Sequence, residues 1–155
     1  MIRNKLLNFI IITFLLTNCG FKIKNNSIDF KLTEIVTKGD KRVNFNIKNS
    51  LSNNFDSDST VLKKIIIESS KNKSIAEKNI KNEITKYRIA ISVNITLTNL
   101  TNNNSQNFSI IKDGVYNVDD TYSVSLNNEK KLIKLLTISL TEEIFEKLAD
   151  LSDDI

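Results

Sequence analysis

The sequence predicts an α+β domain, a two-layer sandwich in which one short and one long helix lie on one face of a four-stranded, mainly antiparallel sheet. From Tyr87 to Leu97, apolar residues occupy every second position, which is the period of a strand with one buried and one exposed face. From Ile133 to Leu151, apolar residues recur every three or four positions, which is the period of an amphipathic helix. Each pattern has one apolar face to bury, so we expect the helix to cover the sheet.

The N-terminal third predicts a strand, a turn and a short helix. Ile28, Phe30 and Leu32 alternate with polar residues, as in a half-buried strand. Gly39 and Asp40 form a turn signal, and the Asp40 carboxylate can accept hydrogen bonds from the first N–H groups of a following helix. On that helix, three apolar residues four positions apart share one face. They are Val43, Ile47 and Leu51.

Two further strands and the loop between them follow in the middle of the chain. Residues 61–69 are rich in β-branched side chains and predict the second strand. Residues 70–83 are polar and basic, and they predict a long loop. The third strand follows at 86–98 and has the most regular alternation in the chain.

The C-terminal third predicts a hairpin and the long helix. An Asn-rich turn at 101–105 leads into a fourth strand that starts at Phe108, with Gly114 marking a bulge or bend. Asn127 or Asn128 is expected to cap the long helix.

The chain begins with a segment of the secretory type. Arg3 and Lys5 precede the uncharged apolar run 6–16, which is shorter than the roughly 20 residues that a spanning helix needs. A simple secretory signal would end in small residues, whereas this one ends at Cys19, the only cysteine, with Leu16 three positions before it. A buried free thiol is the alternative interpretation of this cysteine.

This segment resembles a bacterial lipoprotein precursor. The resemblance implies removal of residues 1–18, a diacylglyceryl group on the Cys19 sulfur and an acyl chain on its new amino terminus. The mature chain, 19–155, is then one lipid-anchored domain, and Gly20 implies sorting to the outer membrane, where the domain faces the periplasm.

Composition argues against catalysis. The chain has no His and no Trp, and its one Cys is expected to carry lipid, which removes the usual zinc ligands and the thiolate and imidazole nucleophiles. The acidic pairs Glu142-Glu143 and Asp153-Asp154 are sequence neighbours, which do not face each other on a helix. We therefore expect no enzyme activity, no metal and no cofactor beyond the covalent lipid. Without Arg3 and Lys5, the chain carries 20 basic and 18 acidic side chains, and this nearly balanced charge argues against binding of nucleic acid.

The mature chain also resembles the LPS-assembly lipoproteins (LptE family). The likeness rests on Cys19-Gly20-Phe21-Lys22-Ile23, on the strand 87–97 and on the long terminal helix. It implies an LptE-like domain that sits as a plug inside an LptD-like outer-membrane β-barrel, helps the barrel to assemble and helps lipopolysaccharide to reach the outer leaflet. A lipoprotein pilot or an auxiliary subunit of another envelope transport or secretion machine is the alternative.

A basic segment offers a candidate contact with lipopolysaccharide. Residues 63–88 carry eight Lys or Arg against three Glu, while residues 142–155 are acidic. Several converging cations suit the phosphates of lipid A. The expected contacts are Lys71, Lys73, Lys78, Lys81 and Arg88. The alternative is an ordinary solvated loop.

Overall fold

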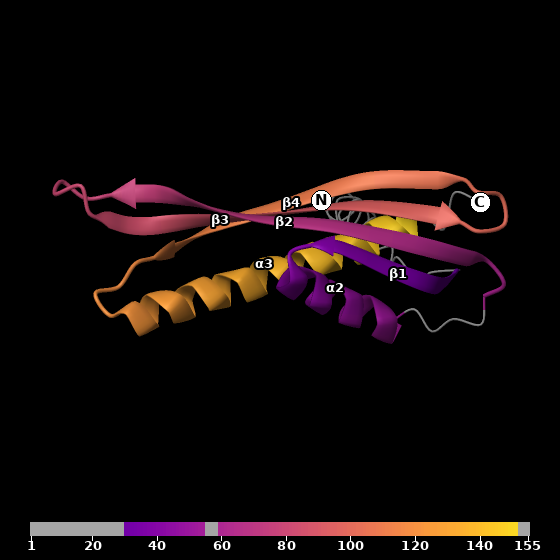
Figure 1. The fold of residues 1–155 in the computed structure, drawn as a ribbon, viewed down its shortest axis with the longest axis horizontal. Coiled ribbons are helices and arrows are strands. Elements are labelled where there is room, and N and C mark those ends of the chain that lie inside the picture. Colours follow the sequence, from indigo (N-terminus) through magenta and orange to yellow (C-terminus); the bar gives the residue numbers. More distant parts are fainter. Residues whose placement is uncertain (1–29, 55–58, 152–155) are drawn as a thin grey trace, which may run out of the picture.

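The computed structural model describes residues 30–54 and 59–151, and it confirms the α+β architecture. Figure 1 shows a long, twisted sheet with both helices lying against one side of it. The elements follow in the order β1 (Lys31–Gly39), α2 (Lys41–Asn54), β2 (Leu62–Lys78), β3 (Ile84–Asn99), β4 (Ser105–Asn117) and α3 (Tyr122–Asp150).

The sheet has the strand order β1-β2-β3-β4. β2, β3 and β4 are antiparallel neighbours joined by hairpins, whereas β1 runs parallel to β2. A parallel pair cannot be closed by a tight turn and needs a crossover connection. α2 is part of that connection, and it brings its apolar face back onto the sheet beside β1.

The first strand lies later in the chain than expected. It begins at Lys31 and runs to Gly39, while Ile28 lies outside the described residues. The pairing with β2 shifts between Leu32 and Glu34, so that Leu32 and Ile35 pack against the core although they are three positions apart. This irregularity interrupts the alternation of apolar and polar residues after Leu32. The alternation in the sequence therefore indicates the strand only as far as Leu32.

Gly39 and Asp40 make the turn into α2 as expected. Gly39 has φ of +95°, and a Cβ placed on it would lie 1.8 Å from the Ser69 carbonyl oxygen. Only glycine fits this close approach without strain. The Asp40 carboxylate accepts hydrogen bonds from the N–H groups of Arg42 at 3.1 Å and Val43 at 3.0 Å, which caps the helix.

The core lies between the sheet and the two helices. Alternate residues of β3 face it, and the intervening side chains form the opposite, polar face of the sheet. The fully or nearly fully buried members include Ile89, Ile91, Val93, Ile95 and Leu97 from β3, Val43, Ile47 and Leu51 from α2, and Ile133, Leu140, Ile144 and Leu148 from α3.

β2 is much longer than the sequence pattern predicted. Residues 70–78, which were expected to be loop, continue the strand and pair with β3 as far as Ile84. Every residue from 71 to 80 is exposed, so neither face of this part of the strand carries an apolar pattern. The connection to β3 is therefore only residues 79–83, where the Asn79 side chain accepts hydrogen bonds from the N–H groups of Lys81 and Glu83.

α3 begins earlier than the expected cap at Asn127 or Asn128. The helix starts at Tyr122, and Thr121 is its N-cap, without a side-chain capping bond. Its first turns are mostly exposed, so the apolar periodicity appears only farther along. Within the described residues, no helix combines the length and the apolar character that crossing a bilayer requires.

Gly114 does not mark a bulge. β3 and β4 pair in a continuous register through this residue, which lies opposite Ile89. A Cβ on Gly114 would lie 2.8 Å from Cδ1 of Leu132 and 3.6 Å from Cδ2 of Leu136. The glycine thus lets α3 lie close to β4.

Candidate functional site

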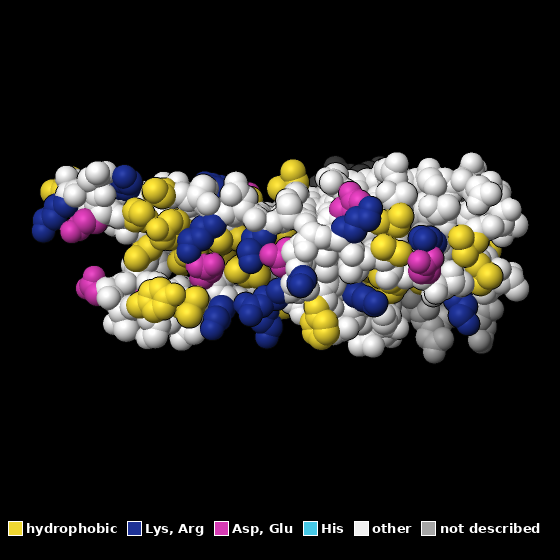
Figure 2. All heavy atoms as spheres, viewed as in Figure 1, with side chains coloured by type: hydrophobic (Ala, Val, Ile, Leu, Met, Phe, Trp, Pro, Cys, Tyr) yellow, Lys and Arg dark blue, Asp and Glu magenta, His cyan; other side chains and the backbone are white. Residues whose placement is uncertain are grey.

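The end of the molecule that carries the β2–β3 hairpin holds the candidate site. Figure 2 shows this end opening as a notch between the hairpin and the first turns of α3. At the base of the notch lies a cleft of about 420 Å³ between β2, β3, β4 and α3. Its lining includes Lys73, Tyr87, Tyr116, Tyr122 and Glu129.

A polar cluster joins three of the elements that line this cleft. Lys73 on β2 forms an ion pair of 2.5 Å with Glu129 on α3, and the Tyr116 hydroxyl of β4 donates to the same carboxylate at 2.8 Å. The Lys73 ammonium also lies 4.3 Å from the centre of the Tyr87 ring and 5.3 Å from that of Tyr116. Both distances are within the range of a cation–π contact. The cluster therefore ties the long hairpin to the helix.

The cluster favours the charged forms of its two ions. Partial burial opposes the charge on Lys73, but its hydrogen bonds to Glu129 and Tyr116 outweigh burial and raise its pKa. Burial likewise opposes the charge on Glu129, but the bonds from Lys73 and Tyr116 lower the pKa of this carboxyl. Burial, with the hydrogen bond to Glu129, raises the pKa of the Tyr116 hydroxyl. At neutral pH the cluster is an ion pair with a neutral tyrosine.

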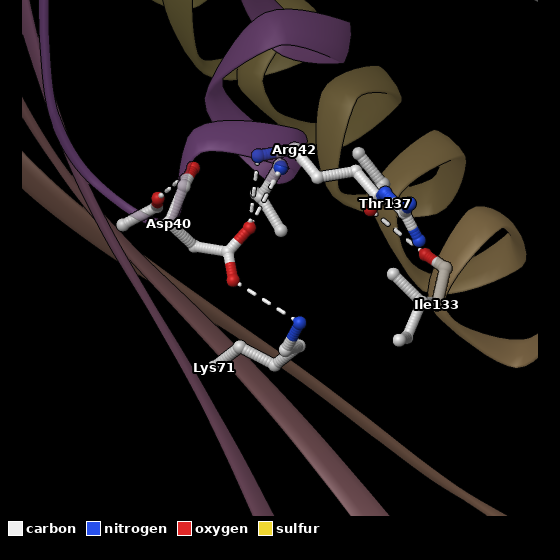
Figure 3. A network of polar contacts seen from close by, with 7 residues as sticks. Asp40, Arg42, Lys71, Ile133 and Thr137 are labelled. Atoms are coloured by element: carbon white, nitrogen blue, oxygen red, sulfur yellow. Dashed lines mark hydrogen bonds and ion pairs between the residues drawn. The ribbon is translucent and has the colours of Figure 1, made fainter. Parts of the chain in front are cut away.

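The structure does not gather the five predicted basic residues into one cluster. Lys71 forms an ion pair with Asp40 at 3.1 Å, as Figure 3 shows, and Lys73 is bound to Glu129. Both therefore lie on the side of β2 that faces the helices. Arg88 lies on the opposite face of the sheet, where it pairs with Asp113.

The other two predicted cations lie at the hairpin tip, which we define as residues 78–83. The Lys78 ammonium donates to the Asn82 side chain at 2.9 Å, and Lys81 is exposed. Of the five predicted contacts, the structure thus places only Lys78 and Lys81 where a multivalent anion could approach without displacing a carboxylate. Cys19, the expected lipid-attachment residue, lies outside the described residues.

The sequence reasoning missed the apolar side chains at this end. Ile80 is fully exposed at the hairpin tip, Ile75 is half exposed on β2, and Tyr122 is largely exposed at the start of α3. A lone isoleucine between Lys78 and Lys81 was the available signal. The hairpin tip therefore presents an apolar side chain flanked by two cations.

The face of the sheet opposite the helices is polar with paired charges. Lys64 pairs with Glu34 at 2.8 Å and Lys38 with Glu68 at 2.9 Å. Short side chains fill much of the remainder and bond one another across strands, as Ser70 and Ser92 do at 2.8 Å. This face suits a hydrated environment.

These features define an elongated α+β sandwich with a polar sheet face and a projecting basic hairpin. Rare lipoprotein B from Shewanella oneidensis has the same fold, with a TM-score of 0.60 and 15% identity over 76% of this chain and 95% of that chain. Uncharacterized lipoprotein B from Nitrosomonas europaea matches with a TM-score of 0.55 and 12% identity over 87% of this chain and 94% of that one.

These two structures support the expected α+β fold and show that it occurs in two proteins described as lipoproteins. At such low identities, the likeness concerns the fold. No protein-family model and no curated protein matches the sequence.

Proposed function

We propose that this chain is a lipid-anchored outer-membrane lipoprotein that plugs an LptD-like β-barrel, assists its assembly and helps deliver lipopolysaccharide to the outer leaflet. The observation that carries the proposal is the fold shared with two bacterial lipoproteins over nearly their whole length. The expected lipid on Cys19 would hold the domain at the membrane. The role is one of binding and support, without covalent chemistry.

The polar face of the sheet supports a position inside a barrel. The interior of an outer-membrane barrel is polar, so a plug must offer it hydrogen-bonding groups and few apolar side chains. The face built around Ser70, Ser92, Asn94 and Thr96 is mostly polar, although Ile111 is exposed on it, and its charges are mostly paired within the chain. Such a face can contact the inner wall of the barrel or the water inside the barrel.

The hairpin tip supports a contact with lipopolysaccharide. Its two cations can approach phosphate oxygens, and the exposed Ile80 can touch an acyl chain. Lys71, Lys73 and Arg88 would first have to leave the carboxylates of Asp40, Glu129 and Asp113. We therefore expect Lys78 and Lys81 to contribute most of the affinity among the five predicted contacts.

Charge reversal at the hairpin tip tests the contact with lipopolysaccharide. In the full-length chain, Lys78→Glu with Lys81→Glu should weaken lipopolysaccharide binding about fivefold, the effect of roughly 0.5 kcal/mol for each exposed charge. The matched control reverses two exposed cations on α2, Lys41→Glu with Lys48→Glu, and should bind normally. Equal binding by all three proteins would refute the contact.

Depletion of the chain in its host tests the wider function. We expect a loss of the assembled LPS-assembly barrel and of lipopolysaccharide at the cell surface. If both persist while another envelope complex fails to assemble, the chain is instead a pilot or an auxiliary subunit of that machine.

A further inference from the structure

A second surface lies between the two helices, away from the hairpin. A groove of about 870 Å³ runs along α2 and α3. Its apolar lining comes from Phe45 of α2 and from Ile133, Ile138 and Phe145 of α3. Phe45 is 64% exposed and Ile138 is 46% exposed, although both belong to an otherwise well-packed layer. This volume is near the upper end of the range for small-molecule sites.

Two threonines make the floor of the groove more apolar than their residue type suggests. The Thr137 hydroxyl donates to the Ile133 carbonyl at 2.8 Å, and the Thr141 hydroxyl donates to the Thr137 carbonyl at 2.7 Å. Both hydroxyls thus donate their hydrogen bonds within the helix and need no hydrogen-bonding partner from a ligand. An apolar chain could therefore lie on this floor without leaving these hydroxyl groups unbonded.

Three cations stand at one end of this groove. Arg42 comes from the start of α2, and Lys130 and Lys134 come from α3. In Figure 3, the Arg42 side chain reaches across from α2 toward Thr137 on α3. Figure 2 shows Lys and Arg side chains gathered over the middle of α3, next to the start of α2.

These three cations differ from three of the five predicted basic residues around the hairpin. Lys71, Lys73 and Arg88 each pair with a carboxylate, whereas Arg42, Lys130 and Lys134 have no ion-pair partner among residues 30–54 and 59–151. The single carboxylate in the groove lining, Glu142, lies two helical turns beyond Lys134. The groove is therefore cationic at one end. The rest of its lining combines the apolar side chains with the polar residues Asn46, Asn49, Ser50 and Glu142.

We propose that the groove binds one anionic glycerophospholipid, with its phosphate at Arg42, Lys130 and Lys134 and its acyl chains along Phe45 and Ile138. A phospholipid has an anionic head at one end and two apolar tails at the other. This arrangement matches the cationic end of the groove and the apolar side chains farther along it. The separation of cations from apolar residues favours a phospholipid over an amphipathic peptide, whose charges would be spread along its length. Lipid A has more acyl chains than this one groove can hold.

This site goes beyond the proposed function, since it uses neither the hairpin tip nor the polar sheet face. The test is native mass spectrometry of the full-length chain in non-ionic detergent, with phosphatidylglycerol or phosphatidylcholine of the same acyl chains added. We expect one phosphatidylglycerol to be retained per chain, at least about fivefold more than phosphatidylcholine. Both lipids carry the phosphate, but the choline ammonium of phosphatidylcholine would be repelled by the three cations of the groove.

Variants separate the groove from the remaining surface. Phe45→Gln with Ile138→Gln, and separately Arg42→Gln with Lys134→Gln, should each reduce retention of phosphatidylglycerol about fivefold. Ile111→Gln, on the opposite sheet face, and Lys48→Gln, on the far side of α2, are the apolar and cationic controls and should retain it normally. All four residues of the groove variants are exposed, so the fold should survive. Equal retention of both lipids, or unchanged retention by the groove variants, would overturn the proposal.

The other possible occupants are distinguished by a photo-crosslinking residue at position 45 in cells, with position 111 as the control. Crosslinking of position 45 to phospholipid supports the proposal. Crosslinking to a partner protein, to lipopolysaccharide or to another part of this chain, with no phospholipid adduct, would overturn it. None of these outcomes depends on whether the hairpin binds lipopolysaccharide.

Discussion

At the scale of single residues, Lys73 shows how the hairpin is held in place. Its ammonium contacts Glu129 from α3 and the rings of Tyr87 and Tyr116 from β3 and β4. A lysine in this position was predicted to contact a ligand, but its nearest partners belong to the protein. The residue therefore helps to position the hairpin against α3, and the charge available to a ligand lies farther out at the hairpin tip.

Replacing Glu129 by Gln tests this contact through its pH dependence. The variant should lower the free energy of unfolding by about 1 kcal/mol at neutral pH, since the ion pair is only partly exposed. The folded-state pKa of Glu129 lies below its ordinary value of 4.5, so the stabilisation is complete above about pH 4.5 and is lost as the pH falls through the folded-state pKa.

The measurement is urea unfolding of both proteins between pH 7 and pH 3. The difference between wild type and variant should shrink toward zero at the acidic end, while the exposed control Glu146→Gln should differ little from wild type at any pH. A difference that stays constant with pH would contradict the assigned role of Glu129.

Two glycines should respond differently to alanine. Gly39→Ala should lower the free energy of unfolding by about 2–4 kcal/mol, because φ is positive and the new Cβ meets a backbone oxygen that cannot move alone. Gly114→Ala should cost less than about 1 kcal/mol, because the Leu132 side chain can shift. Chemical denaturation measures the free energy of unfolding of both variants. Similar losses would contradict the different contacts expected for the two new Cβ atoms.

At the scale of elements, the sequence predicted those parts that have one buried face. β3 keeps its alternation from Ile89 to Leu97 because helices cover that face throughout, and α3 shows its periodicity from Ile133 onward for the same reason. The outer half of β2 and the first turns of α3 lie beyond that cover. Their side chains are mostly polar and largely exposed on both faces, so hydrophobic periodicity cannot indicate them.

The candidate site was harder to predict, because it depends on pairing between distant residues. The charge of Lys71 or Arg88 is visible in the sequence, but their partners Asp40 and Asp113 lie far away along the chain. The groove cations Arg42, Lys130 and Lys134 gave no local signal, since they come from two helices that meet only in the folded chain. Local composition identified the basic segment, but it could not show which of its charges remain unpaired and can contact a ligand.

Amide hydrogen exchange tests the length of β2. Beyond Ser69 this strand has β3 as its only neighbour, because β1 ends at Gly39. In an antiparallel pair, alternate residues exchange backbone hydrogen bonds, so every second amide from Ser70 to Ile75 should be protected. Amides at 65–67 should all be slow, and the amide of Asn102 in the exposed turn between β3 and β4 should be fast. Uniformly fast exchange over 70–75 would show that this segment is the loop that composition suggested.

At the scale of the whole molecule, the surfaces with different chemistry lie apart. The polar sheet face lies opposite the helices, and the basic hairpin tip projects at one end (Figure 1). The groove with three cations at one end lies between α2 and α3. Under the proposals made above for the barrel, lipopolysaccharide and a phospholipid, this separation would let one small domain contact all three without competition among them. Partnership with the barrel is the central claim of the proposed function.

The most direct test is a pull-down of the tagged, full-length lipoprotein from solubilised outer membranes, followed by identification and quantification of the proteins recovered. The account predicts one large outer-membrane barrel of the LPS-assembly type at a near-equimolar ratio, and the same barrel should be recovered with the Lys41→Glu, Lys48→Glu control. Recovery of a secretin or of inner-membrane transporter subunits in place of that barrel would contradict the proposed function, while leaving the fold unchanged.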